Sequence, residues 1–385
     1  MTNSDIRIVF MGTPEFAVAP LKAIRSAGMN IAGVVTAPDK PAGRGKKITS
    51  PAVKVYAENT LDCPVLQPEK LKDTAFIGEL AGLKAHLFIV VAFRMLPEAV
   101  WTLPEHGTIN LHASLLPHYR GAAPINWCII NGEESTGLTT FLIDREIDTG
   151  KILLQEEMTI GPDQDAGELH DRMMETGAAL LVRTIEQVMQ GTVAPVPQEA
   201  FNIPADQLKK APKIFKPDCR IDWSRGSATV HNLIRGLSPF PGAFTYLVEP
   251  GGEQSMLKVF ATKKTGELNQ SPTARQNEER TAGQGKERAP GQGKERAPGQ
   301  GGEHTAGQGG EQTSQAAGQN EELKAGQGME AAPGTLRSDN ATTLEVMTGD
   351  GWLRLVSLQA AGKKRMPVAD FLRGFRGDIN ECVVH

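Results

Sequence analysis

The feature that most constrains the fold is an alternation of short apolar runs with helix-capable segments over the first 111 residues. The apolar runs have the length of strands and are residues 6–11, 31–35, 64–66, 86–92 and 107–111. Segments that can form helices separate them, at residues 16–28, 51–59 and 74–83. Alternating strands and helices favour a parallel sheet with helices packed on its faces. The sequence therefore predicts an α/β domain at the N-terminus.

Turn and cap residues add detail to this domain. After the first strand, Thr13 is expected to cap a helix that has Pro14 at its first position. A pair of strands at residues 137–143 and 151–160 precedes a long helix at residues 165–190, which Gly191 would end. We place the end of the domain at this glycine, so that the domain spans residues 1–191.

Two polar side chains end the fifth strand of the expected sheet. Asn110 and His112 are two residues apart, so in a strand they point to the same face and can address one atom. Parallel sheets bind ligands beyond the carboxyl ends of their strands, which is where these residues fall. An amide N–H and an imidazolium N–H aimed at a carbonyl oxygen would stabilise the negative charge that builds there during attack. We therefore predict an oxyanion site for acyl transfer to an amine.

Asp148 completes this candidate site. Its carboxylate could hold His112 charged and correctly oriented. An Asn-x-His pair alone is weak evidence, because polar residues at a strand end more often satisfy local backbone groups. The combination of all three residues favours catalysis over that structural alternative.

The second half of the chain has a different pattern. Residues 192–211 are rich in proline and show no clear period, which is typical of a linker. A short helix at residues 231–237 comes next. Strand-like segments then occur at residues 243–248, 257–262, 342–347 and 352–358, before a closing helix at residues 367–375. Short strands around one helix predict a small barrel, and we expect this domain at residues 212–263 and 335–385.

Residues 264–334 interrupt the second domain. The octapeptide Gly-Gln-Gly-Lys-Glu-Arg-Ala-Pro occurs at residues 283–290 and again at 291–298, and degenerate copies follow. The repeat has almost no apolar side chain to bury and much glycine, so its composition predicts a low-complexity, disordered insertion. Strand-like segments flank it on both sides, and we therefore expect a loop within the barrel. A weak interaction tail is the alternative.

Composition excludes several classes of protein. The sequence has no run of about 18 apolar residues and no basic N-terminal region followed by an apolar stretch, which predicts a cytoplasmic protein without a membrane partner. The four cysteines lack Cys-x-x-Cys spacing, so neither a zinc site nor a disulfide framework is indicated, and we expect no metal. The turn after the first strand lacks the Gly-x-Gly-x-x-Gly pattern, which disfavours a dinucleotide. The formal net charge of −4 is an average that hides basic clusters.

Longer motifs support a family resemblance. In the N-terminal half they are GTPEF at residues 12–16, PDKPAGRGKK at 38–47, VAFRMLP at 91–97, SLLP at 114–117, YRGAAPI at 119–125 and DTG at 148–150. Two more are GLSPFPGA at residues 236–243 and GKK at 362–364. On these motifs the chain resembles the methionyl-tRNA formyltransferases of bacteria and organelles, over nearly its whole length apart from the insertion.

The resemblance implies a Rossmann-like formyltransferase domain followed by an OB-like β-barrel. The family transfers a formyl group from 10-formyltetrahydrofolate to the α-amine of methionine on initiator tRNA, and a monomer is expected. The resemblance gives catalytic roles to Asn110, His112 and Asp148. It places Ser114, Leu115, Leu116 and Pro117 in the tetrahydrofolate pocket. Phe93 and His118 depart from the tyrosine and arginine that are usual in the family.

Basic residues bear on the choice of substrate, because related enzymes use the same catalytic residue types on glycinamide ribonucleotide, on an amino sugar, or with water as acceptor. A glycine-rich loop at residues 40–47 carries four cations and suits a nucleic-acid end. Two further clusters follow the linker and the last long strand. We predict tRNA contacts at Lys40, Arg44, Lys46, Lys47, Lys209, Lys210, Lys363 and Lys364. A small-molecule formyltransferase, a formyl hydrolase and an inactive tRNA-binding protein remain as alternatives.

Overall fold

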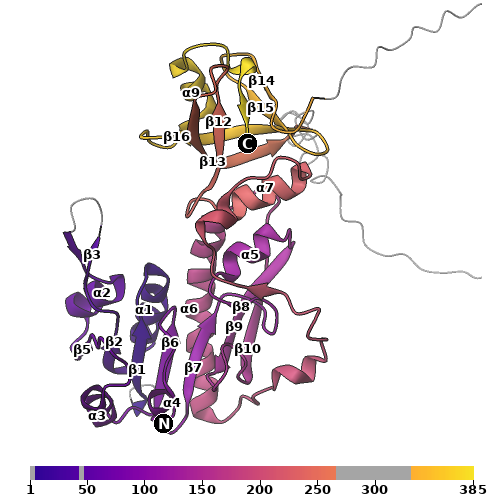
Figure 1. Cartoon of the computed structure of the whole chain (residues 1–385). Coiled ribbons are helices and arrows are strands. Elements are labelled where there is room, and N and C mark those ends of the chain that lie inside the picture. The colour runs from indigo at the N-terminus through magenta and orange to yellow at the C-terminus, as the bar shows by residue number, and fades with distance from the viewer. Residues whose placement is uncertain (1–4, 43–46, 266–330) are drawn as a thin grey trace, which may run out of the picture. The chain divides into compact units, whose positions relative to one another are not determined.

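The N-terminal half is built on a seven-stranded sheet with the order β10-β9-β7-β6-β1-β2-β5 (Figure 1). Its strands are β1 (Arg7–Gly12), β2 (Asn30–Val35), β5 (Val65–Leu66), β6 (Leu87–Val91), β7 (Thr108–His112), β9 (Ser135–Leu142) and β10 (Ile152–Thr159). The neighbouring strands β5, β2, β1, β6 and β7 run parallel. Strand β9 pairs antiparallel with β7, and β10 pairs antiparallel with β9. The predicted α/β class with a parallel sheet is confirmed.

The computed structural model describes residues 5–42, 47–265 and 331–385. The predicted low-complexity character of the insertion therefore concerns residues that lie almost entirely outside the described ranges. Arg44 and Lys46 lie outside them as well.

Helices cover both faces of the sheet. Successive side chains of a strand point to opposite faces, and here both sets are apolar and buried. Ile8 and Phe10 of β1 belong to the core under α1 (Val18–Ser26), α2 (Ala52–Thr60) and α6 (Ala166–Gln190). Val9 and Met11 belong to a second core under α3 (Thr74–Gly82) and α4 (Glu98–Trp101). The two faces together make a three-layered domain whose strands present their carboxyl ends at one edge.

Local signals set the ends of α6 as the sequence predicts, but not the start of α1. The Asp165 side chain caps α6 in a reciprocal box with Glu168, and Gly191 ends the helix with φ +67°. The predicted Thr13 cap is wrong. A 3₁₀ turn, η2 (Glu15–Ala17), precedes α1 and buries Phe16, and this tertiary packing outweighs the local cap signal.

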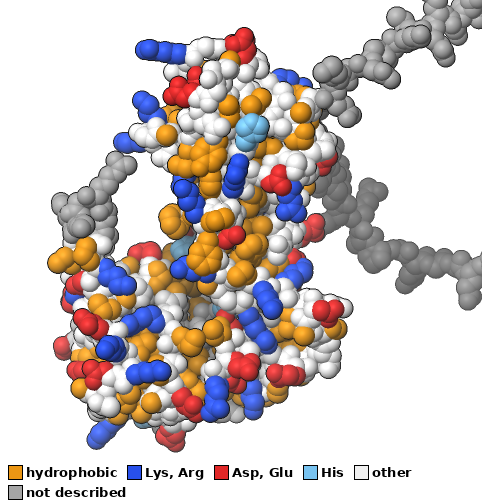
Figure 2. Space-filling model, viewed as in Figure 1, with side chains coloured by type: hydrophobic (Ala, Val, Ile, Leu, Met, Phe, Trp, Pro, Cys, Tyr) orange, Lys and Arg blue, Asp and Glu red, His pale blue; other side chains and the backbone are white. Residues whose placement is uncertain are grey.

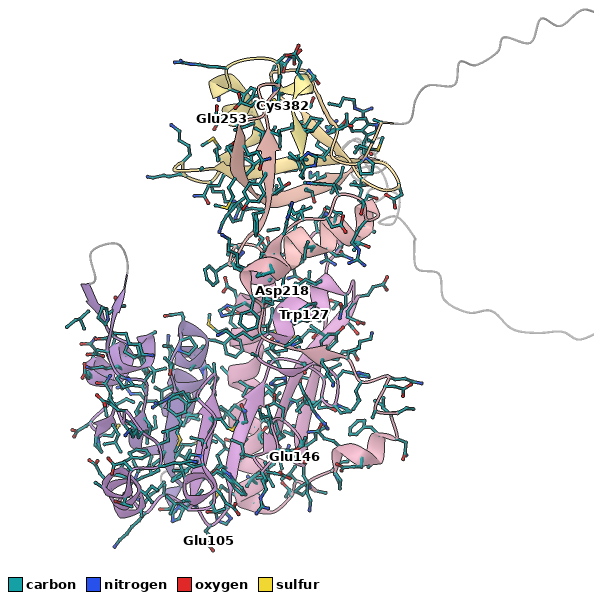
Figure 3. The ribbon with its side chains drawn as sticks, viewed as in Figure 1. Glu105, Trp127, Glu146, Asp218, Glu253 and Cys382 are labelled. Atoms are coloured by element: carbon teal, nitrogen blue, oxygen red, sulfur yellow. The ribbon has the colours of Figure 1, made fainter. Side chains whose placement is uncertain are left out.

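The proline-rich segment after α6 packs along the N-terminal domain. Val196 pairs with Ile152, and β11 (Lys210–Ala211) pairs in parallel with β8 (Arg120–Gly121). On α5 (Pro124–Ile130), the Trp127 indole donates a hydrogen bond to the carbonyl oxygen of Pro212 (Figure 3). The segment therefore has fixed contacts with the N-terminal half of the chain.

A second, antiparallel sheet follows, with the order β14-β15-β16-β13-β12-β18. Its strands are β12 (Ala243–Val248), β13 (Gln254–Lys264), β14 (Leu336–Ser338), β15 (Leu344–Met347), β16 (Trp352–Ala360), β17 (Met366–Pro367) and β18 (Val383–Val384). A bridge between Thr335 and Val383 links its two ends and nearly closes a barrel. Two helices, α7 (Ser227–Gly236) and α9 (Val368–Gly374), pack on its core. The predicted barrel is confirmed.

Within the ranges that the structure describes, no helix is both long enough and apolar enough to cross a membrane.

Candidate active site

A cavity of about 730 Å³ lies at the carboxyl ends of β6 and β7. Val90, Ala92 and Phe93 line it from the end of β6, and Asn110 and His112 line it from β7. The loop after β9 adds residues 144–148, with Glu146 on the exposed rim (Figure 3). The parallel topology thus brings three separate segments of the chain to one site.

Asn110 presents a free amide to this cavity. Its backbone is fixed on both sides, because it pairs with Val90 of β6 and with Phe141 of β9. Among the described residues its side-chain amide has no hydrogen-bond partner. The amide is therefore held by a rigid strand and is free to donate to a bound molecule.

His112 is held in one orientation by a backbone carbonyl. Its Nε2 atom lies 2.9 Å from the carbonyl oxygen of Tyr119. A carbonyl oxygen can only accept, so Nε2 carries the proton of this hydrogen bond. The ring meets the Phe141 ring edge-on at 6.5 Å, and only 8% of the His112 side chain is exposed. Nδ1 is therefore the ring nitrogen that remains for chemistry.

Asp148 lies beside that nitrogen. Its Oδ2 atom is 3.9 Å from Nδ1 of His112 and accepts a hydrogen bond of 2.9 Å from the Gly121 N–H. The side chain is 12% exposed. The Asp148 carboxylate therefore lies beside Nδ1 of His112, at a distance too long for a direct hydrogen bond.

The backbone around Asp148 is tightly constrained. Asp148 has φ +57°, a left-handed conformation that aspartate tolerates better than most residues. Two residues later, a Cβ atom on Gly150 would lie 1.7 Å from the carbonyl oxygen of Leu142, so only glycine fits. These two requirements explain the Asp-Thr-Gly motif physically.

The four residues predicted to contact folate are not among the residues that line the cavity. Ser114, Leu116 and Pro117 are buried, and Leu115 is half-buried. The Ser114 hydroxyl donates to the carbonyl oxygen of His118, and the Leu116 N–H donates to the Thr139 hydroxyl. These bonds shape the loop that carries Tyr119, whereas a direct folate contact at the four residues stays a prediction.

The predicted basic residues differ in their surroundings. Lys209 forms an ion pair with Glu133, which also accepts a 2.5 Å hydrogen bond from the Tyr119 hydroxyl. Burial opposes ionisation of Glu133, but the bonds from Lys209 and Tyr119 outweigh it and hold the pKa of this carboxyl below its usual value. Lys209 is therefore paired with a carboxylate next to the loop that orients His112, although 49% of its side chain is exposed.

Among the other predicted cations, those that the structure describes lie on the surface. Lys40, at the start of β3 (Lys40–Ala42), is exposed, as are Lys210, Lys363 and Lys364. Lys47 begins β4 (Lys47–Thr49), which pairs with β3, but its side chain lies outside the described atoms, as do Arg44 and Lys46.

The structure also shows basic side chains stacked on aromatic rings near the barrel, a pattern that the sequence analysis missed. Lys213 lies over Phe215, Lys216 over Phe244 and Arg220 over Tyr246, at 5.5 to 5.8 Å from the ring centroids. Figure 2 shows Lys and Arg side chains beside hydrophobic ones in this part of the molecule. The sequence signal for them is a basic run at residues 213–220 that includes Phe215, together with the aromatic pair Phe244 and Tyr246.

In the described part of the chain, no three His, Cys, Asp or Glu side chains lie close enough together to bind a metal ion. The site thus consists of an amide, an imidazole and a carboxylate around one cavity. Such a set can bind a carbonyl oxygen, stabilise charge on it and move a proton.

Comparisons with known families agree over both halves of the chain. Residues 6–185 match the family described as formyl transferase. Residues 213–297 and 311–376 match the formyl transferase C-terminal domain.

Curated relatives extend this match to the full length. A protein named methionyl-tRNA formyltransferase from Parabacteroides distasonis is 42% identical over 377 residues, which are 98% of each chain. Its namesake from Phocaeicola vulgatus is 42% identical over 384 residues and covers 100% of both chains.

Solved structures share the fold at low identity. HypX from Aquifex aeolicus, in a multiply substituted variant, is 15% identical with a TM-score of 0.54, over 97% of this chain and 49% of that one. WlaRD, a sugar 3N-formyl transferase, is 15% identical with a TM-score of 0.53, over 93% of this chain and 99% of that one. At this identity the likeness bears on the fold alone.

Proposed function

The chain belongs to the formyl transferase family, and we propose that it transfers a formyl group from 10-formyltetrahydrofolate to the amino group of methionyl initiator tRNA. Formyl transfer of this kind supports translation initiation. The observation that carries the proposal is the convergence of Asn110, His112 and Asp148 on one cavity. Relatives named for this activity, at 42% identity over the whole length, support the choice of acceptor.

The three side chains have distinct tasks in this proposal. The neutral amine attacks the formyl carbon, a new C–N bond forms, and negative charge develops on the formyl oxygen. The Asn110 amide and the protonated Nδ1 of His112 donate to that oxygen. Nε2 cannot share this task, because the Tyr119 carbonyl oxygen already accepts its proton.

Collapse of the tetrahedral intermediate completes the transfer. The bond between the formyl carbon and the folate nitrogen breaks, and that nitrogen keeps the electron pair. The Asp148 carboxylate takes the proton that the attacking amine loses and returns one to the leaving nitrogen, while its charge supports the His112 imidazolium 3.9 Å away.

Folate binding in this cavity is supported by its lining. Val90, Phe93 and Ile143 offer apolar side chains to a flat ring system, while the polar groups lie at the ends of β7 and of the loop after β9. Phe93 stands where the family usually has tyrosine, so this position offers packing without a hydroxyl.

Recognition of tRNA is the second part of the proposal. We assign phosphate or base contacts to the exposed Lys40, Lys210, Lys363 and Lys364, to Lys47 at the start of β4, and to Arg44 and Lys46, which lie between β3 and β4 in the sequence. Lys209 is assigned a tRNA contact as well, since 49% of its side chain is exposed while it pairs with Glu133.

Measuring the products of the reaction distinguishes the proposed function from its alternatives. The purified protein is incubated with the formyl donor, with and without methionyl initiator tRNA, and both formate and formyl-methionyl-tRNA are measured. The proposal expects formyl-methionyl-tRNA in stoichiometric amounts with released tetrahydrofolate. Formate release without an acceptor would identify a hydrolase, and tRNA binding without turnover would identify a binding protein.

A further inference from the structure

We propose that Gln198 is a positioning residue of the active site. Its side chain connects the loop that orients His112 with the loop that carries Asp148. The inference rests on the proposed function. Gln198 does not line the cavity. It begins the 3₁₀ turn η3 (Gln198–Phe201) in the proline-rich segment after α6, so any effect on the reaction passes through its neighbours.

The burial of Gln198 is exceptional for its segment. Gln198 is 3% exposed, although Val196 is 40% exposed and Phe201 41% exposed. A buried primary amide is tolerated only when its donors and acceptors are satisfied. Its hydrogen bonds therefore show what the segment is fixed to.

All four hydrogen bonds of this amide are made. Nε2 donates to the carbonyl oxygens of Asp148 and Gly150, at 2.9 and 2.8 Å. Oε1 accepts from Nε and Nη2 of Arg120, at 3.0 and 2.6 Å. Carbonyl groups only accept and guanidinium groups only donate, so the amide can have just this orientation.

The donor side of Gln198 fixes the backbone of Asp148. This residue has φ +57°, a conformation that costs free energy unless its surroundings hold it. With its carbonyl oxygen bound by Gln198 and its carboxylate bound by the Gly121 N–H, Asp148 is held at both ends. Its distance from His112 is set by these two contacts.

The acceptor side of Gln198 fixes the loop that orients His112. Arg120 lies between Tyr119, whose carbonyl oxygen accepts from His112, and Gly121, whose N–H donates to Asp148. One amide thus connects the backbone partners of both catalytic side chains. A shift of this amide would move them relative to each other without changing the cavity lining.

The experiment compares Gln198→Glu with wild type. Glutamate has nearly the same shape and keeps an acceptor for Arg120, but it places oxygen against the carbonyl groups of Asp148 and Gly150. We expect kcat to fall about 10- to 100-fold, as for a displacement of a catalytic group by about 1 Å. KM for the formyl donor and for methionyl-tRNA should stay within about threefold, because no lining residue changes. The matched control is Glu199→Gln, one residue along the chain and exposed.

A double-mutant cycle separates positioning from general stability. If Gln198 acts through Asp148, then Gln198→Glu should lower kcat less than about threefold in the Asp148→Asn background. The same fractional loss in both backgrounds would overturn the proposal. So would unchanged kcat in Gln198→Glu, or loss of the thermal unfolding transition in both Gln198→Glu and Gln198→Asn, because Gln198 would then serve folding only. Absence of transfer by wild type would instead reject the proposed function, and the inference with it.

Discussion

Nδ1 of His112 and Oδ2 of Asp148 lie 3.9 Å apart, in side chains that are 8% and 12% exposed. The other ring nitrogen of His112 is bound to a backbone carbonyl, and the Asp148 carboxylate is bound to a backbone N–H. The pair is therefore held by the main chain, and Nδ1 of His112 is the ring nitrogen left for a substrate. This arrangement suits electrostatic stabilisation of a developing oxyanion.

Asp148→Asn tests the charge in this pair. Asparagine keeps the hydrogen bond from Gly121 but removes the negative charge beside His112 and the group that accepts the amine proton. We expect kcat to fall roughly 10²- to 10⁴-fold, the range for loss of a general base. Steady-state formylation kinetics measure the change, with the exposed Asp62→Asn as control. Activity close to that of wild type would remove Asp148 from the mechanism.

Asn110→Ala tests the amide as an oxyanion donor. Its side chain has no hydrogen-bond partner among the described residues, so its loss should leave the fold intact. Removal of one such donor lowers kcat by roughly 10² to 10³. Binding of folate and of tRNA should survive, which fluorescence titration can check. A kcat within about threefold of wild type would contradict the assigned role.

The sequence predicts those features of the site that depend on residues close together in the chain. The two-residue spacing of Asn110 and His112 predicts a shared face of a strand, and both side chains do line one cavity. Tyr119 escapes such reasoning because it holds His112 through its backbone carbonyl oxygen and not through its side chain. Gln198 escapes it because its side chain bonds backbone carbonyl groups 48 and 50 residues away in the chain. Their partners are determined only by tertiary packing.

The fold shows the same limit. The boundaries of the long helix α6 and of the six-residue strand β12 are predicted to within one residue. The strands β14 and β18 are only three and two residues long, so their pattern is too short to read, and they form because partners distant in sequence offer hydrogen bonds.

His231 on α7 predicts a dependence of stability on pH. Burial lowers the pKa of this histidine, and Pro162 and Asp163 oppose that effect only in part. The neutral ring donates from Nε2 to the Pro162 carbonyl oxygen and accepts at Nδ1 from the Thr262 hydroxyl. A lowered folded-state pKa stabilises the fold above the ordinary value of about 6.5, and this contribution is lost as the pH falls through the folded-state pKa.

The comparison with His231→Gln isolates this effect, because carboxylates common to both proteins cancel. The free energy of unfolding, measured in urea, should favour wild type most at neutral pH, and the advantage should shrink as the pH is lowered through the range in which His231 titrates. An advantage that is constant with pH would show that protonation of His231 is not linked to folding.

Arg44→Ala tests the tRNA contact proposed for the basic residues between β3 and β4 in the sequence. A bidentate contact contributes about 1 to 3 kcal/mol, so kcat/KM for methionyl-tRNA should fall about 5- to 150-fold while KM for the formyl donor stays constant. Arg44→Lys should not fully restore activity, because lysine keeps the charge and loses the planar fork. Lys22→Ala, exposed on α1, is the control. Equal losses for both substrates would rule out a role in tRNA recognition.

The most direct test of the account compares three acceptors for wild-type protein with 10-formyltetrahydrofolate as formyl donor. Methionyl initiator tRNA, methionyl elongator tRNA and glycinamide ribonucleotide are supplied in turn, and the initial rate of formyl transfer gives kcat/KM for each. The account predicts that methionyl initiator tRNA has the highest kcat/KM and that glycinamide ribonucleotide gives no transfer. Efficient transfer to glycinamide ribonucleotide, or no transfer to methionyl initiator tRNA, would contradict it.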